Sequence, residues 1–280
     1  MRTIHLIPAA IVLAAVPVAN ADSLVLWNRL GSSSEVMNSA YGPNLSFYGG
    51  GSWPDVTANP AYGPGVFGNA ITIGPGSYGT FDRVHNVIWN NVNNYLNSER
   101  GAVEVWYKQV SNPVDYQNGI YRIFDGGFGR GSGIGLESVV GGLTFNVYFG
   151  GNYTTVQHDI SALNGTWVHV AGVWDRDGIA GSGDKVRLYV DGAIVAASAD
   201  GGWGNIVGTE ADIAGANDGN IAGQFFEDNL KVYDFALTDF SHRFEENWVV
   251  PEPTVGTLII LGGILAQVKR RRQSLIAATC

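Results

Sequence analysis

Three carboxylates lie close together in a loop between two apolar, β-branched segments. Asp175, Asp177 and Asp184 surround Gly178 and a run of small residues. Hard oxygen ligands on a loop are what Ca²⁺ prefers in proteins. Aspartates in a turn also accept hydrogen bonds from their own backbone, without a metal. The pattern therefore leaves a calcium site and a plain solvated turn both open, and favours the turn.

Aromatic residues in glycine- and asparagine-rich stretches form a second set of candidates. An aromatic face can stack on a sugar ring, while neighbouring Asn and Asp side chains hydrogen-bond the hydroxyls. The same rings could instead anchor their loops on the folded domain. The candidates for carbohydrate stacking are Trp53, Tyr62, Trp89, Tyr95, Tyr153 and Trp203.

Acid–base catalysis lacks an obvious pair of carboxylates. Retaining glycosidases need two carboxyl groups about 5–5.5 Å apart, which two residues on one face of a strand could supply. Glu99 and Glu104, and likewise Glu227 and Asp228, have odd spacing and point to opposite faces of a regular strand. His169 lies between two valines without a carboxylate beside it in sequence, which favours a structural role. No catalytic residue is predicted, and a non-catalytic protein is expected.

These side chains must be positioned by strands, because short alternating apolar segments recur along the chain and long helical periodicity is absent. Asp191-Gly192 predicts a type I′ hairpin turn. Thr238 resembles a helix N-cap, which predicts a short helix over 239–246. Strands are expected at 24–27, 70–73, 102–107, 120–124, 143–149, 167–174, 186–190, 193–197 and 225–233. Together they predict an all-β fold, an antiparallel two-sheet sandwich.

Charge and cysteine content exclude some classes of function. The 280-residue chain has a formal charge of −9, and residues 22–253 keep 11 basic and 25 acidic residues, a formal charge of −14. Such a surface disfavours nucleic acid, whose binding depends on neutralising phosphates. It suits neutral sugars and divalent cations, and favours solubility. Cys280 is the only cysteine, so no disulfide is expected in the domain.

Both ends of the chain have the residue patterns of targeting signals. Arg2, an apolar stretch over 6–16 and the small-x-small pattern Ala19-Asn20-Ala21 predict a signal peptide, 1–21, cleaved before Asp22. At the other end, Pro251, Glu252 and Pro253 precede an apolar run over 255–268. As a helix this run would be about 21 Å long, short of the about 30 Å hydrocarbon core. A basic cluster follows: Lys269, Arg270, Arg271 and Arg272.

The C-terminal arrangement, 249–280, resembles the PEP-CTERM sorting signal. The resemblance implies export, a transient inner-membrane helix, cleavage by an exosortase, and delivery to the cell surface or extracellular matrix of a Gram-negative bacterium. The basic cluster would stay cytoplasmic. An ordinary C-terminal membrane anchor is the alternative, and residues 273–280 extend beyond the usual end of such signals.

Three segments resemble in order and spacing the laminin-G-like (concanavalin A-like) jelly roll: 101–108, 165–175 followed by 186–192, and 227–237. The resemblance covers about 27–248 and implies one domain, 22–248. Calcium-binding members of that family imply a site near Asn152 and Glu210. Core positions are expected at Trp106, Trp167, Val170, Val173, Leu188, Val190, Leu230, Val232 and Leu237.

The sequence thus predicts an exported protein whose sandwich binds polysaccharide or another matrix glycan, with calcium as a possible cofactor. A structural or protein-adhesive matrix component without a small ligand is the first alternative, and a glycan-active hydrolase the second.

Overall fold

The computed structural model describes residues 23–49, 55–57, 60–73, 83–110, 120–127, 133–140, 142–149, 152–205, 208–217 and 225–248. They all belong to one compact unit, Ser23–Val250. Within these residues, no helix has the length and apolarity needed to cross a membrane. The predicted signal peptide, the predicted sorting signal and Trp53 lie outside them.

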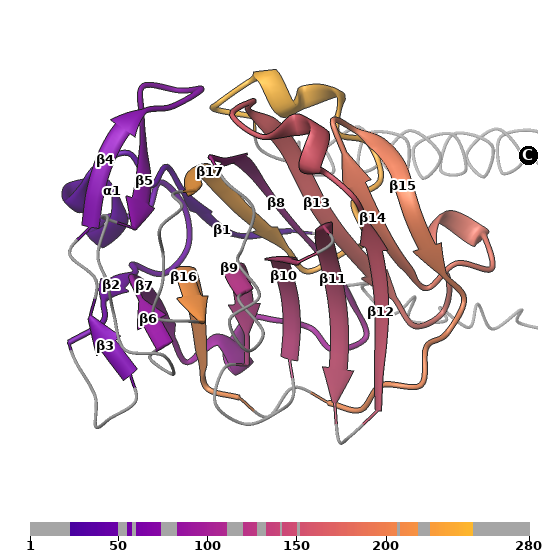
Figure 1. Ribbon diagram of the computed structural model, residues 1–280. Coiled ribbons are helices and arrows are strands. Elements are labelled where there is room, and N and C mark those ends of the chain that lie inside the picture. The colour runs from indigo at the N-terminus through magenta and orange to yellow at the C-terminus, as the bar shows by residue number, and fades with distance from the viewer. Residues whose placement is uncertain are drawn as a thin grey trace, which may run out of the picture. The chain divides into compact units, whose positions relative to one another are not determined.

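Two β-sheets form the unit, one in front of the other (Figure 1). The eight-stranded sheet has the order β15 (Ala193–Ser198), β14 (Val186–Val190), β13 (Val168–Asp175), β8 (Arg100–Gln109), β17 (Phe225–Tyr233), β5 (Asn69–Ile73) and β4 (Pro60–Pro64), and β1 (Leu24–Asn28) pairs with β17. The nine-stranded sheet has the order β12 (Asn152–His158), β11 (Gly142–Phe149), β10 (Gly133–Val139), β9 (Ile120–Gly126), β16 (Glu210–Asn217), β6 (Arg83–His85) and β3 (Asp55–Thr57), and β7 (Val87–Asn90) and β2 (Ser46–Phe47) pair beside β16. Helical segments are short: α1 (Ser33–Met37), η1 (Val92–Asn94), η2 (Ser161–Leu163), η3 (Ile179–Gly181) and η4 (Ser241–Phe244).

The predicted all-β, two-sheet sandwich is confirmed, and each of the predicted strands is present. The Asp191-Gly192 turn is also confirmed, because both residues have positive φ, as a type I′ turn requires. The helix predicted over 239–246 is wrong. Only the 3₁₀ turn η4 forms there, and the Asp239 carboxylate accepts a hydrogen bond from the Ser241 backbone N–H at its start.

The main apolar core lies between the sheets and takes side chains from alternate positions of both. Val103, Val105 and Tyr107 point into it from β8, and Leu143, Phe145 and Val147 from β11. Of the predicted core residues, Trp167 is the exception, because its ring is only half-buried.

A second apolar cluster covers the outer face of the eight-stranded sheet. Residues 234–248, here called the strap, supply Leu237 and Phe240 to this cluster. Beneath the strap, the buried Glu104 carboxylate lies 2.9 Å from His169 Nε2 and 3.1 Å from His242 Nε2, and accepts a 2.5 Å hydrogen bond from the Tyr233 hydroxyl. His169 is therefore a buried contact within the domain, which is consistent with its predicted structural role.

Candidate functional site

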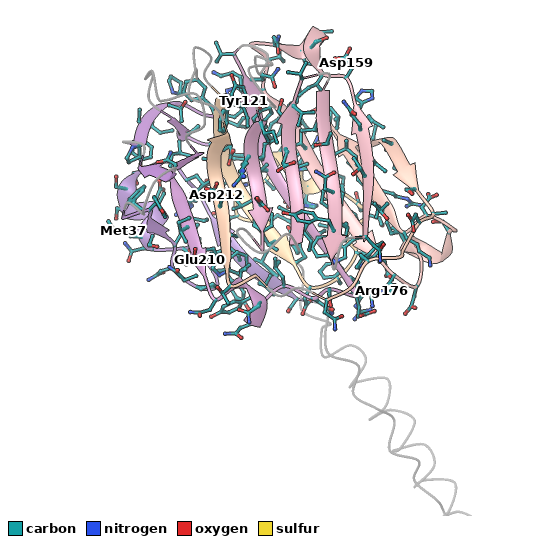
Figure 2. The ribbon with its side chains drawn as sticks, turned by 60° about the horizontal axis from the view of Figure 1, so that its bottom comes forward. Met37, Tyr121, Asp159, Arg176, Glu210 and Asp212 are labelled. Atoms are coloured by element: carbon teal, nitrogen blue, oxygen red, sulfur yellow. The ribbon has the colours of Figure 1, made fainter. Side chains whose placement is uncertain are left out.

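Two rows of polar residues cross the outer face of the nine-stranded sheet. Strand register places Asp212, Asp125, Gly135, Asn146 and Thr155 side by side across β16, β9, β10, β11 and β12. The neighbouring row is Gly215, Arg122, Glu137, Thr144 and Gln157. Figure 2 shows Asp212 over the strands of this sheet, away from their ends.

These side chains point away from the core because the residues between them point into it. Leu136 flanks Glu137, Phe145 and Val147 flank Asn146, and all three belong to the main core. Since successive side chains of a strand alternate between faces, Glu137 and Asn146 lie on the opposite, outer face.

Arg122 lies among the carboxylates of this face. Its Nη1 is 3.3 Å from Asp212 Oδ2 and 3.5 Å from Asp125 Oδ2, and all three residues are buried. The Tyr148 hydroxyl donates a 3.0 Å hydrogen bond to Asp125 Oδ1. Because the carboxylates are held by the guanidinium and the phenol, their orientation is fixed before any ligand arrives.

Glu137 is more accessible to solvent than the other two carboxyl groups of the site, Asp125 and Asp212. It is half-buried, and its Oε2 accepts a 3.0 Å hydrogen bond from Asn146 Nδ2. The Thr155 hydroxyl donates to Asn146 Oδ1 at 2.7 Å, which fixes the amide orientation. Burial, and then the negative charge of Asp125, raises the pKa of Glu137 to about 7. Arg122, Asp125, Asp212, Glu137, Asn146, Tyr148 and Thr155 are called the polar face below.

The polar face is not evident from the sequence, because the spacing of carboxylates within one strand does not show which strands pair. Its members come from β9, β10, β11, β12 and β16, and only register brings them together. A signal did exist. Glu137 and Asp212 are each a lone acid flanked by apolar or small residues in a short alternating segment.

The carboxylates predicted to bind calcium lie elsewhere. Asp175 Oδ1 accepts a 2.9 Å hydrogen bond from the Asp177 backbone N–H, and Asp184 Oδ2 forms an ion pair with Arg187 at 2.9 Å. Among the residues with described positions, no group of three or more His, Cys, Asp or Glu is arranged to hold a metal ion. These contacts match the solvated-turn alternative.

The family-implied calcium residues, Asn152 and Glu210, are exposed at the first positions of β12 and β16. In Figure 2, Glu210 lies near one end of the sheet, and Arg176, which adjoins Asp175 and Asp177, lies elsewhere along that end.

The aromatic candidates are mostly unsuited to stacking. Trp89 is fully buried, and Trp203 is 4% exposed with its Nε1 donating to the Ser98 carbonyl at 2.8 Å. Neither leaves a ring face for a sugar, so both predictions are corrected: Trp89 is a core residue of β7, and Trp203 anchors its loop on the main core. Tyr62 is half-buried and its hydroxyl lies 3.1 Å from Ser33 Oγ, whereas Tyr95 is 39% exposed. The backbone of Tyr153 pairs with that of Tyr148, at the edge of the polar face.

Comparison with protein families agrees with this sandwich. A laminin-G family model, described as the concanavalin A-like lectin/glucanases superfamily, matches residues 82–240, more than half of the chain. The chain belongs to this superfamily. The matched segment contains every residue of the polar face. No curated protein matches the sequence.

Solved structures of botulinum neurotoxin share the fold. The receptor-binding domain of the C/D mosaic serotype has a TM-score of 0.60 at 17% identity, and the type G receptor-binding domain 0.57 at 12%. The serotype D ligand-binding domain, in complex with N-acetylneuraminic acid, has a TM-score of 0.59 at 16%. Each match covers 80% of this chain and 51% of the neighbour, so the chain spans about half the length of these structures. At such identities the likeness shows the fold alone.

Proposed function

We propose that this superfamily member is an exported surface or matrix protein that binds a glycan, without catalysis, on the polar face. The single observation that carries the proposal is the hydrogen-bonded set Glu137, Asn146 and Thr155, which reaches solvent beside the buried ion pairs of Arg122. The superfamily includes lectins by its description, and one fold neighbour was solved with a bound sugar.

The chemistry of the polar face suits sugar hydroxyls. Glu137 and Asn146 are half-buried and present a carboxyl and an amide group, and Thr155 fixes the orientation of the amide, while Asp125 is buried and held by Tyr148. A hydroxyl can donate to one such group and accept from another. Because each hydrogen bond contributes only about 0.5–1.5 kcal/mol net, we expect affinity to come from several sugar units.

A polysaccharide array on the full-length protein, in calcium and again in EDTA, tests the proposal. Asn146→Ala should weaken binding of the retained glycan about tenfold, because it removes the amide and frees Glu137. Glu245→Gln, an exposed change of one acid on the strap over the other sheet, is the control and should leave binding unchanged. Binding that persists in EDTA is expected, since the acceptors are held by protein groups.

Two results would contradict the proposal. Binding that Asn146→Ala leaves intact would remove the polar face as the site. No binding to any glycan would move the structural or protein-adhesive alternative to first place. Binding that is present in calcium and lost in EDTA would indicate a calcium-dependent site. Its candidate ligands are Asn152, Glu210, Asp175, Asp177 and Asp184.

A hydrolase is the second candidate, and one observation favours it. Glu137, with a pKa raised to about 7, lies near the Asp125 carboxylate, and acid catalysis of glycoside cleavage needs a protonated carboxyl beside an ionised one. Release of reducing ends from the bound glycan would support this function. Glu137→Gln should then abolish release while binding persists, whereas a wild-type protein that binds without release supports the lectin.

Delivery of the protein belongs to the same proposal. The tripeptide Pro251, Glu252 and Pro253, the apolar run over 255–268 and the basic cluster support sorting by an exosortase. A matrix destination fits a disulfide-free, acidic, glycan-binding domain, because polysaccharide is abundant there and the acidic surface keeps the protein soluble.

A further inference from the structure

The outer face of the other sheet carries a different kind of surface. Trp167, directly before β13, lies beside Lys108 on β8 and Phe226 on β17. Phe226 pairs with Lys108, and Val168 pairs with Tyr107. Lys108 Nζ lies 4.9 Å from the Trp167 ring centroid and 4.5 Å from that of Phe226. All three side chains are half-buried, so the ammonium sits between two rings that still reach solvent.

The strap extends this surface at its border. Phe244 lies 5.4 Å from the Trp106 ring, which shares the outer face of β8 with Lys108, and is 63% exposed. The Arg243 guanidinium lies 4.5 Å from the Phe244 ring centroid. Val110, directly after β8, is 47% exposed. Trp167, Lys108, Phe226, Phe244, Arg243 and Val110 are called the cationic aromatic patch.

Gly63 on β4 leaves room for the Phe226 ring. A Cβ added at Gly63 on β4 would lie 2.8 Å from Phe226 Cε1, so glycine is what admits the ring there. Exposed rings and a cation gathered on one side are unusual for a domain with a formal charge of −14. Lys108 also has no salt bridge within the described part of the chain.

We propose that the cationic aromatic patch is a second glycan site, selective for acidic polysaccharides that contain uronic acid. The C–H faces of a sugar ring pack on exposed aromatic rings, and a uronate carboxylate pairs with Lys108 or Arg243. Charge decides between occupants. A polyanion is repelled by the acidic surface elsewhere, so the patch is where its approach is favourable, whereas a neutral glycan gains nothing from the two cations.

This site is separate from the polar face. The polar face holds three carboxyl groups against one guanidinium, which disfavours a second carboxylate. The two surfaces lie on the outward sides of opposite sheets, so one molecule could hold a neutral and an acidic chain at once and link them.

The test measures binding of the full-length protein to two uronate oligomers, oligogalacturonate and oligomannuronate. Each is compared with its carboxyl-reduced counterpart, which keeps the sugar rings and loses the charge. The wild type should bind at least one acidic oligomer about tenfold more tightly than its reduced form, with binding that weakens as salt is added. Lys108→Gln should remove most of this preference for the acidic oligomer. Trp167→Ala should weaken binding of both the acidic and the reduced oligomer.

Lys185→Gln removes one positive charge outside the patch and should leave the preference unchanged, while circular dichroism reports whether each variant folds. Equal binding of acidic and reduced oligomers by the wild type would overturn the proposal, and so would a preference that survives Lys108→Gln or is lost equally in Lys185→Gln. Asn146→Ala separates the two sites. It should leave uronate binding intact, so either glycan proposal can fail without the other.

Discussion

At the scale of single residues, Glu227 is a carboxyl placed where water does not reach. It points from β17 into the region between the sheets beside Tyr107, is fully buried, and neither carboxyl oxygen has a hydrogen-bond partner in the described part of the chain. Burial, and then the negative charge of Asp212, raises the pKa of Glu227 well above its ordinary value. Its protonated form is therefore the one that fits the fold.

This placement predicts how stability depends on pH. A carboxyl whose pKa is higher in the folded than in the unfolded state contributes stability that is complete below the unfolded pKa and is lost as pH rises toward the folded pKa. Glu227→Gln, which stays neutral, should unfold at the same urea concentration as the wild type near about pH 4, and at a higher concentration near about pH 8. Glu210→Gln on the exposed surface is the control. An equal effect of Glu227→Gln at both pH values would contradict the assignment.

At the scale of elements, Glu104 connects three strands to the strap. Burial alone would raise the pKa of this carboxyl, but hydrogen bonds from His169 and His242 outweigh it and hold the pKa well below its ordinary range. Glu104→Gln should cost about 3 kcal/mol of the free energy of unfolding near neutral pH. The pKa of Glu104 is lower in the folded than in the unfolded state. Its contribution to the free energy of unfolding is therefore complete above the unfolded pKa and shrinks as pH falls below that value.

Hydrogen exchange of the strap amides separates this role from general destabilisation. His242→Gln removes the imidazole, with its contact to Glu104 and its stacking on Trp248, and should speed exchange over 234–248 more than over β8 and β13. Uniform acceleration in all three segments would mean that Glu104 acts on the whole fold and not on the strap.

The two sheets approach closely where Gly172 on β13 faces Phe145 on β11. A Cβ added at Gly172 would lie 2.2 Å from the Phe145 ring. Gly172→Ala should therefore lower the free energy of unfolding by about 1–3 kcal/mol through overpacking. Adding Phe145→Leu should recover part of the loss, which urea denaturation of the double mutant would show. Independent, additive losses would indicate that the two residues do not contact.

How far the sequence could predict the structure depends on which strands carry strong patterns. β8, β11, β13 and β17 contain branched and aromatic residues in alternation, and were predicted. β10 and β16 are interrupted by Gly133, Gly135 and Gly215, and were not. Those two strands carry Glu137 and Asp212, so the polar face stayed hidden although Arg122 lies on the predicted segment 120–124. Register across strands is a long-range property that spacing within one strand cannot supply.

Burial explains the mistaken aromatics in similar terms. Trp89 and Trp203 occur in glycine- and asparagine-rich stretches that look exposed, yet such stretches pack on the sandwich by their largest side chain. Trp167 is the opposite case. It was expected in the core, but it precedes β13 at an outward position, where its ring lies beside Lys108. Residue type alone predicts that a tryptophan side chain will be mostly buried. It does not predict on which face of the sheet the ring lies.

At the scale of the whole molecule, the two sheets turn different chemistry outward. The nine-stranded sheet presents the polar face, and the eight-stranded sheet presents the strap and, beside it, the cationic aromatic patch. The polar face lies on strands, and so do Lys108 and Phe226 of the cationic aromatic patch, and strands position side chains more rigidly than loops do. A domain without cysteine relies for this rigidity on its two apolar clusters.

The final prediction concerns delivery. The compact unit ends at Val250, directly before the Pro-Glu-Pro tripeptide, and within it Trp248 stacks on His242 at 3.5 Å between ring centroids. Substitution Pro251→Ala/Glu252→Ala/Pro253→Ala should leave the fold unchanged and block cleavage, because the altered residues lie outside the described domain and within the proposed recognition sequence. Immunoblots of membrane and released fractions from the native host should show an unprocessed, membrane-retained chain. Glu245→Ala, an exposed change in the strap, should be processed as the wild type is. Normal processing of the triple variant would refute sorting through this tripeptide, and a wild-type chain that stays uncleaved in the membrane would identify the tail as an ordinary anchor.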